Sequence, residues 1–178
     1  MPPTELHVYD FDGTLFRSTN KPPWFVNQHR WWGVNPQSLH PPCTPDQPGG
    51  DWWVSKAVAA AASSIRNPDA LAVLVTGRLV AFRGRVRQLL SDRGLRFQET
   101  HFLPSGGSVK SYKVEVMTAI LEENPTITDR TWAARIETYT GSAALPVPLI
   151  RDMTFAEAIE STTAADAIRI EARHVDGR

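Results

Sequence analysis

Two aspartates with one residue between them stand at the end of a short apolar run near the start of the chain. Residues 6–9 are mostly apolar or aromatic, as suits a strand in a buried sheet, and Asp10 and Asp12 follow, with Gly13 next. Side chains at i and i+2 of an extended chain point to the same side, so both carboxylates should address one small volume. Gly13 allows the chain to turn sharply there. Two close carboxylates need a hard cation, or a division in which one is ionised and one protonated, and both arrangements suit phosphoryl chemistry.

The elements that must position these carboxylates alternate along the chain. After the first strand we expect strands at 70–75, 95–103, 126–128 and 146–150, and helices at 54–65, 79–91, 112–123, 131–139 and 154–159. Such alternation predicts an α/β fold, a doubly wound (Rossmann-like), mostly parallel sheet with helices on both faces. Ligands of these sheets bind beyond the carboxyl ends of the strands. Asp10, Thr76 and Asp129 each fall at a predicted strand end.

Length and composition indicate one globular domain. The 178 residues suffice to bury roughly 70% of the unfolded surface. Nineteen basic and nineteen acidic residues balance, which argues against binding nucleic acid through overall charge, although a local patch is compatible with neutrality. Cys43 is the single cysteine, so no internal disulfide forms and a reducing compartment fits. No signal peptide or membrane-spanning run is visible, so we expect a cytoplasmic protein without membrane contact.

A long insert separates the first strand from the rest of the domain. Residues 17–53 are rich in proline, which excludes long regular helices, but they also carry tryptophans, which disordered linkers usually lack. We expect an ordered excursion of the kind that often forms a lid. For any one ring, anchoring the loop to the core is the simpler role. The alternative is that Trp31 or Trp32 lines the substrate entrance. The domain should span 1–160, and residues 161–178, which show no clear period, should form a C-terminal tail.

Residues 10–16, Asp-Phe-Asp-Gly-Thr-Leu-Phe, resemble the first motif of the haloacid dehalogenase superfamily of phosphotransferases. The resemblance implies that Asp10 is the nucleophile, which forms an aspartyl phosphate, and that Asp12 is the general acid. It further implies that Thr76 is the hydroxyl of the second motif, a donor to the phosphoryl oxygens. The resemblance also implies that Lys113 is the cation of the third motif. A solvated helix lysine is the alternative for Lys113, and Lys110 is its local rival.

The fourth motif of that superfamily supplies carboxylates for Mg²⁺. Asp129 resembles a carboxylate of this motif, so the resemblance implies a Mg²⁺ site formed by Asp10, Asp12 and Asp129. The superfamily usually shows two acids here, whereas this chain has Thr128 before Asp129, and Glu137 is the next acid. We therefore expect Mg²⁺ to bind weakly and to exchange readily.

Further motifs are similar to one branch of the superfamily, the Swiss Army Knife RNA repair-like branch. They are the tryptophan-rich insert, the triplet 76–78 (Thr-Gly-Arg), the pair 112–113 (Tyr-Lys) and the pair 129–130 (Asp-Arg). The likeness implies phosphatase action on nucleic-acid ends, such as a 3′-phosphate. It makes Gly77, Arg78, Trp31 and Trp32 the candidate substrate-binding residues.

Three more arginines follow the second motif. Arg83, Arg85 and Arg87 place positive charge where a polynucleotide backbone could lie. A solvated face of the predicted helix explains them slightly better, whereas for Arg78, which adjoins Thr76, we favour a functional role.

Together these patterns predict a Mg²⁺-dependent phosphomonoester hydrolase whose phosphorylated substrate is a nucleic-acid end or a nucleotide, with no obligate protein partner. Three alternatives stay open. A small-molecule phosphatase would use the same residues. A phosphate- or nucleic-acid-binding module with weakened catalysis would explain the reduced fourth motif. A structural protein would use the aromatic rings of the insert to bind a partner.

Overall fold

The computed structural model describes residues 1–25, 31–105, 107–127, 132–137 and 167–172. Within this part of the chain, a five-stranded sheet has the order β3-β2-β1-β5-β4. β1, β2 and β3 run parallel to one another, whereas β5 pairs antiparallel with both β1 and β4. The strands are β1 (Glu5–Tyr9), β2 (Ala70–Leu79), β3 (Glu99–Leu103), β4 (Trp132–Glu137) and β5 (Ala167–Ala172).

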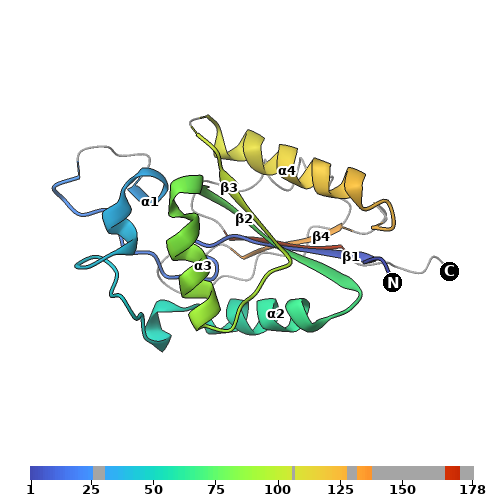
Figure 1. Cartoon of the computed structure of the whole chain (residues 1–178), viewed down its shortest axis with the longest axis horizontal. Coiled ribbons are helices and arrows are strands. Elements are labelled where there is room, and N and C mark those ends of the chain that lie inside the picture. Colours follow the sequence, from blue (N-terminus) through green and yellow to red (C-terminus); the bar gives the residue numbers. More distant parts are fainter. Residues whose placement is uncertain (26–30, 106, 128–131, 138–166, 173–178) are drawn as a thin grey trace.

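Helices cover both faces of the sheet (Figure 1). They are α1 (Trp31–Val34), α2 (Ser55–Arg66), α3 (Arg83–Asp92) and α4 (Val109–Glu123), with 3-10 turns at Pro36–Leu39, Gly50–Trp52 and Val80–Phe82. α2 and α3 lie on one face and α4 on the other. The predicted α/β class is therefore confirmed as three parallel strands flanked by helices.

Alternation along β1 and β2 supplies both hydrophobic cores. Tyr9 and Leu74 are fully buried on the side of α2 and α3, whereas Val8 and Val73 pack with Met117 on the side of α4. Side chains of adjacent strand residues point to opposite faces, so each strand contributes apolar side chains to both layers. The first and second strands are thus fixed between two cores, which gives the loops at their ends firm anchors.

The carboxyl ends of the parallel strands meet at one edge of the sheet. Tyr9 lies opposite Leu74 in the β1–β2 register, and Thr76 lies opposite Phe102 in the β2–β3 register. β2 continues to Leu79, beyond the predicted end at 75, with a register shift after Thr76 that lets Leu79 pair with Leu103. Thr76 is therefore inside a strand, but it extends past the end of β1, at the edge where Asp10 emerges.

Local signals set the ends of the helices. α3 ends at a left-handed Gly94 (φ 76°), and the Leu95 amide donates to the carbonyl of Leu90 over 2.8 Å. α4 begins three residues earlier than the predicted start at 112, because the Ser108 hydroxyl accepts from the Ser111 amide over 3.3 Å. Both helices are confirmed, with shifted ends.

Two predictions beyond α4 are wrong. Residues 132–137 of the helix predicted at 131–139 instead form β4, because pairing with β5 outweighs the helix propensity of its two alanines. The predicted strand at 126–128 is wrong for residues 126 and 127, which form a turn where the Ile127 amide donates to the Asn124 carbonyl. The elements predicted at 146–150 and 154–159 lie outside the described residues. β5 falls in the segment 161–178, where we expected no element.

Candidate active site

Asp10 follows β1 directly and is paired with a lysine from a distant part of the sequence. Its Oδ2 accepts a hydrogen bond from Lys113 Nζ over 2.6 Å, and its Oδ1 accepts one from the Phe11 amide over 2.7 Å. The side chains of Asp10 and Lys113 are 16% and 11% exposed respectively. α4 supplies Lys113 from its second turn. The lysine predicted for the third motif thus meets the first aspartate, with a cation held against a nearly buried carboxylate.

The turn after Asp10 is rigid because apolar side chains anchor it. Gly13 has φ 72°, and its amide donates to the carbonyl of Phe16 over 2.8 Å. Phe11 and Phe16 are fully buried and stack with ring centroids 5.0 Å apart. Phe16 also forms a β-bridge with Trp53, which joins the turn to the end of the insert. The two aspartates therefore project from a turn whose apolar members are locked into the core.

Asp12 is held by Arg78. The Nε atom of Arg78 donates to both carboxylate oxygens, over 3.1 Å to Oδ1 and 2.9 Å to Oδ2, and Nη2 donates to Oδ1 over 2.6 Å. The Ser18 hydroxyl also donates to Oδ1. Nη1 of Arg78 donates to the Ser38 hydroxyl over 2.9 Å. A bidentate pair of this kind fixes the plane of the carboxylate as well as its position.

Arg78 is 1% exposed, so its guanidinium is buried between the second strand and the insert. It also lies 5.6 Å from the centroid of the Phe11 ring. We predicted Arg78 as a substrate contact, and this stays a prediction; the structure shows its buried guanidinium bound to Asp12. Ser18 and Ser38, which complete this arrangement, were missed, because isolated serines in a loop carry no spacing signal.

Thr76 and Gly77 lie on β2, just beyond the residue that pairs with the end of β1. Thr76 is fully buried, and its Oγ1 accepts from the Arg78 amide over 3.3 Å. A Cβ atom on Gly77 would lie 2.8 Å from Val109 Cγ1, so only glycine lets the start of α4 approach the strand this closely. Gly77 therefore helps to bring Lys113 to Asp10, in addition to the substrate-binding role that the sequence predicts for it.

The tryptophans of the insert differ in exposure. Trp31 is buried, and Nε1 of both Trp31 and Trp32 donates to the Thr19 carbonyl, over 3.2 and 2.8 Å. Trp24 is 59% exposed and packs edge-to-face on Trp31, with centroids 5.8 Å apart. The open ring is thus Trp24, which was not among the predicted substrate-binding residues, whereas the indole N–H groups of Trp31 and Trp32 tie the insert to residue 19.

Asp129, the predicted ligand from the fourth motif, lies outside the described residues. In the part of the chain that the structure describes, no three His, Cys, Asp or Glu side chains gather closely enough to hold a metal ion. Nor does any helix of that part have the length and apolar character needed to cross a membrane.

Comparison with known proteins places this chain in a family. Residues 11–139 match the model described as HAD domain family 1 in Swiss Army Knife RNA repair proteins, which covers more than half of the chain. No solved structure matches the chain. The matched region contains Asp12, Thr76, Arg78 and Lys113 and begins one residue after Asp10. The chain belongs to this family of haloacid dehalogenase (HAD) domains from RNA repair proteins, whose general chemistry is that of phosphatases.

Proposed function

We propose that the chain is a phosphomonoester hydrolase in which Asp10 is the nucleophile. An oxygen of Asp10 attacks phosphorus, the bond from phosphorus to the ester oxygen breaks, and an aspartyl phosphate forms. Water then attacks that phosphorus, which releases inorganic phosphate and regenerates Asp10. The observation that carries this proposal is the pairing of Asp10 with Lys113 at the edge of the sheet where Thr76 lies.

Lys113 and Thr76 would stabilise the transferring phosphoryl group. Phosphoryl transfer depends mainly on positioning and on charge stabilisation around three equatorial oxygens. Lys113 Nζ, 2.6 Å from Asp10, has further protons to donate to a phosphoryl oxygen. The buried Thr76 hydroxyl accepts from the Arg78 amide and keeps its own proton for donation. Both groups are pre-positioned, so they would cost little reorganisation in the transition state.

Asp12 would act as the general acid and Arg78 as its positioning residue. Among the described contacts, Oδ1 of Asp12 receives three hydrogen bonds and Oδ2 receives one. Oδ2 is therefore the oxygen that can carry a proton to the leaving group and later take one from water. Arg78 holds the carboxylate in one orientation throughout these two transfers.

A Mg²⁺ ion fits the donors that this edge offers. Each oxygen of Asp10 accepts one hydrogen bond from its described neighbours and keeps a lone pair, and carboxylate oxygens are the ligands that Mg²⁺ prefers. We propose Asp10, Asp12 and Asp129 as the protein ligands; Asp12 would offer its backbone carbonyl oxygen, because Arg78, Ser18 and the proton to be transferred occupy its side chain. When bound, Mg²⁺ would offset the negative charge of the phosphoryl oxygens.

The proposed substrate is a phosphorylated nucleic-acid end, such as an RNA 3′-phosphate, and the insert would act as a lid on a doubly wound sheet. The family description, with its RNA repair proteins, supports this substrate class. The insert is tied to the catalytic turn by the Phe16–Trp53 bridge and to Asp12 through Ser38 and Arg78, so its position bears directly on the site. Closure over the substrate would exclude water from the phosphoryl group.

Phosphate release tests the function directly. The substrates are an aryl phosphate, a nucleotide, and oligonucleotides phosphorylated at the 3′ or 5′ end, each with Mg²⁺ and with excess chelator. We expect Mg²⁺-dependent release that is fastest from the 3′-phosphorylated oligonucleotide, and none from Asp10→Asn prepared in parallel. Inactivity on every substrate, or equal release by Asp10→Asn, would contradict the proposed function. Preference for the nucleotide would reassign the substrate to a small molecule.

A further inference from the structure

Three exposed arginines lie along the third helix and the edge strand β3. Arg83 and Arg87 are one helical turn apart on α3, and Arg96 lies in the connection from α3 to β3. The guanidinium carbon of Arg83 is 5.8 Å from the centroid of the Phe102 ring. Nε and Nη2 of Arg87 donate to Thr100 Oγ1 over 3.0 and 2.6 Å. We call Arg83, Arg87 and Arg96 the arginine row.

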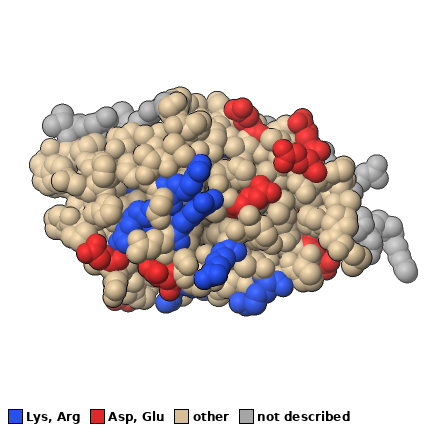
Figure 2. Space-filling model, viewed as in Figure 1, with Lys and Arg blue, Asp and Glu red and all other residues tan. Residues whose placement is uncertain are grey.

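The arginine row follows the strand direction. Thr100 and Phe102 are two residues apart on β3, so they face the same side of the sheet, the side covered by α3. Glu99 and His101 alternate with them, face the other side, and pair with each other at 2.8 Å. The nearest acid of the strand therefore does not neutralise the row. Figure 2 shows the Lys and Arg side chains gathered over α3 on the face in view.

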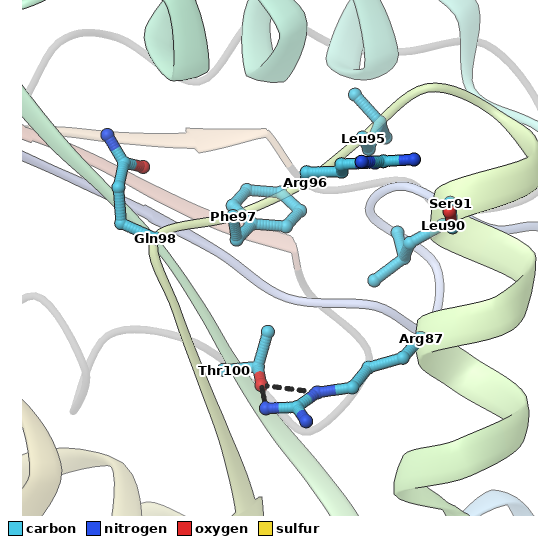
Figure 3. A pocket seen from close by; sticks show the side chains of 8 residues that line it. All are labelled: Arg87, Leu90, Ser91, Leu95, Arg96, Phe97, Gln98 and Thr100. Carbon is cyan, nitrogen blue, oxygen red and sulfur yellow. Dashed lines mark hydrogen bonds between the residues drawn. The ribbon is translucent and has the colours of Figure 1, made fainter.

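A pocket of about 240 Å³ lies at the far end of the row (Figure 3). Arg87 and Arg96 line it together with the ring of Phe97, and Leu90 and Leu95, both 2% exposed, form its apolar part. No carboxylate is among the residues that line it. An aromatic ring, apolar side chains and two guanidinium groups together suit a flat, uncharged ring attached to an anion.

The other end of the row lies beside the catalytic edge. Phe102, whose ring lies under the Arg83 guanidinium, is opposite Thr76 in the β2–β3 register. The row therefore leads from the proposed phosphatase site, along β3, to the pocket.

We propose that the arginine row binds the phosphate backbone of a single-stranded nucleic acid, and that one base of that strand enters the pocket against Phe97. Since the phosphorylated end of the same strand would be the substrate of Asp10, this inference rests on the function proposed above. Arginines four residues apart on a helix place positive charges roughly 6 Å apart along the helix axis, which suits the separate phosphate charges of a nucleic-acid strand. A base must be unpaired to enter such a pocket, which favours a single strand over a duplex.

The hydrogen bonds to Thr100 strengthen this assignment. They hold the Arg87 guanidinium beside the pocket before any ligand arrives, which lowers the entropy cost of binding. A solvated helix face, the interpretation favoured from the sequence, would leave these side chains without fixed positions. Arg85, by contrast, points away from the row and donates to carbonyls of the insert, so it belongs to a different surface.

The arginine row can be tested apart from catalysis with a labelled single-stranded RNA that has no terminal phosphate. Its binding is measured by fluorescence anisotropy across a salt series. We expect the double variant Arg87→Gln/Arg96→Gln to bind roughly tenfold more weakly. The slope of log affinity against log salt should fall by about 0.7 for each phosphate that the variant no longer neutralises. The matched control is Lys56→Gln/Arg66→Gln, which removes two exposed charges from α2 and should bind as the wild type does.

Two single variants separate charge from shape. Arg87→Lys keeps the charge and should retain most of the binding, whereas Phe97→Leu keeps an apolar side chain and should lose the stacking contribution, roughly a further tenfold. Thermal unfolding of each variant identifies any that fail to fold, and Arg96→Gln, in an exposed loop, then provides the test alone.

Unchanged RNA affinity and salt slope in the double variant would overturn the proposal. The proposal would also be overturned if the wild type bound poly-glutamate as tightly as RNA and Phe97→Leu did not change the affinity for RNA. If the wild type hydrolyses an aryl phosphate but binds no RNA, the arginine row is wrong and the proposed phosphatase stands. If it binds RNA through the row but hydrolyses no phosphomonoester, the row stands and the proposed reaction is wrong.

Discussion

At the scale of single residues, the two aspartates of the first motif have different partners. Asp10 is paired with a flexible lysine on α4, and Asp12 with a buried arginine on β2. A lysine ammonium is a mobile point charge that can share its protons with an incoming phosphoryl group, whereas the planar guanidinium fixes the geometry of one carboxylate. This difference suits the roles proposed for them, Asp10 as the nucleophile that meets phosphorus and Asp12 as the general acid that holds one orientation.

The two aspartates should therefore fail differently when changed. Asp10→Asn should abolish turnover with the fold intact, because the amide cannot form the aspartyl phosphate. Asp12→Asn should be slow but should still form the phosphorylated enzyme from an aryl phosphate, whose leaving group needs no proton. Acid-quenched phosphate incorporation checks both. Near wild-type phosphate release by Asp10→Asn would contradict the assignment.

Arg78→Lys should lower kcat through Asp12 and leave KM for the substrate nearly unchanged. Lysine keeps the charge but cannot donate to both oxygens of Asp12 and to Ser38 at once. General acid catalysis is worth roughly 10²–10⁴ in rate, so a misoriented acid should cost about tenfold or more with an alkyl phosphate. The loss should be smaller with an aryl phosphate.

Steady-state kinetics on the two esters separates this role from others. Arg93→Lys, an exposed change at the end of α3, is the matched control. A rise in KM with kcat unchanged would make Arg78 a substrate contact, as its sequence suggested.

At the scale of elements, the insert is attached to the body by buried side chains and by two arginines, Arg78 through Ser38 and Arg85 through backbone carbonyls. Arg85 of α3 donates from Nε to the Leu39 carbonyl over 3.1 Å, and from Nη2 to the carbonyls of Pro45 and Asp46 over 3.1 and 3.0 Å. Leu39 itself is fully buried in the core with Phe82 and Val86. The middle of the insert is therefore docked on α3, although its sequence has little regular secondary structure.

Arg85→Ala should loosen the insert without unfolding the sheet. The change leaves three carbonyls without their charged donor and should cost about 2 kcal/mol of the free energy of unfolding. Limited proteolysis should then cut the insert faster than in the wild type, and denaturant unfolding should give the stability loss. Equal protection of the insert in Arg85→Ala and in Arg93→Ala would contradict this role.

The rings of the insert should divide into structural and exposed classes. Trp31→Ala should cost about 3–5 kcal/mol of stability, as large aromatic truncations in a core do, because Trp31 is buried against Phe25 and Trp24. Trp24→Ala should leave the melting temperature almost unchanged and should raise KM for a phosphorylated oligonucleotide by roughly tenfold if this ring stacks on a base.

An aryl phosphate provides the control for the Trp24 variant, since it has no neighbouring base. Equal loss of activity on both substrates would instead place Trp24 at the entrance of a small-molecule pocket.

At the scale of the whole molecule, the parallel strands bring separate motifs to one edge. The first motif follows β1, the second lies on β2 beyond the end of β1, and Lys113 arrives from a helix packed on the opposite face to α3. A metal ion at this edge would bind the folded chain far better than the unfolded chain, in which these carboxylates are apart. Metal binding is therefore linked to global stability.

Mg²⁺ should accordingly raise the melting temperature of the protein, independently of turnover. A concentration of one hundred times Kd adds about 2.7 kcal/mol to the free energy of unfolding. Thr128→Asp should lower Kd by adding a negative charge beside Asp129 in sequence, and Asp10→Asn should raise it. Thermal unfolding across a Mg²⁺ series measures both effects. An unchanged melting temperature at saturating Mg²⁺ would remove the metal from the site.

The sequence by itself determined the parts that depend on local order. The turn after β1 follows from an apolar run ending in the first motif. The helix α2 follows from an alanine-rich run that ends before Asn67 and Pro68. The helices α3 and α4 follow from periodic apolar residues, with Gly94 after the end of α3. The resemblance assigned Lys113 to the third motif as a cation, and the structure pairs it with Asp10 across 103 positions.

Only the tertiary structure decided which side chains act together across the insert. Arg78 meets Asp12 across 66 positions and Ser38 across 40, and Arg85 reaches the insert across a similar span. No periodicity links such residues, since their contact depends on how a loop of irregular backbone docks on a helix. The strand β4 has the same origin, because its alanines favour a helix until β5 offers an edge for pairing. Local sequence patterns thus identify the candidate site residues, whereas the partner of each side chain depends on tertiary packing.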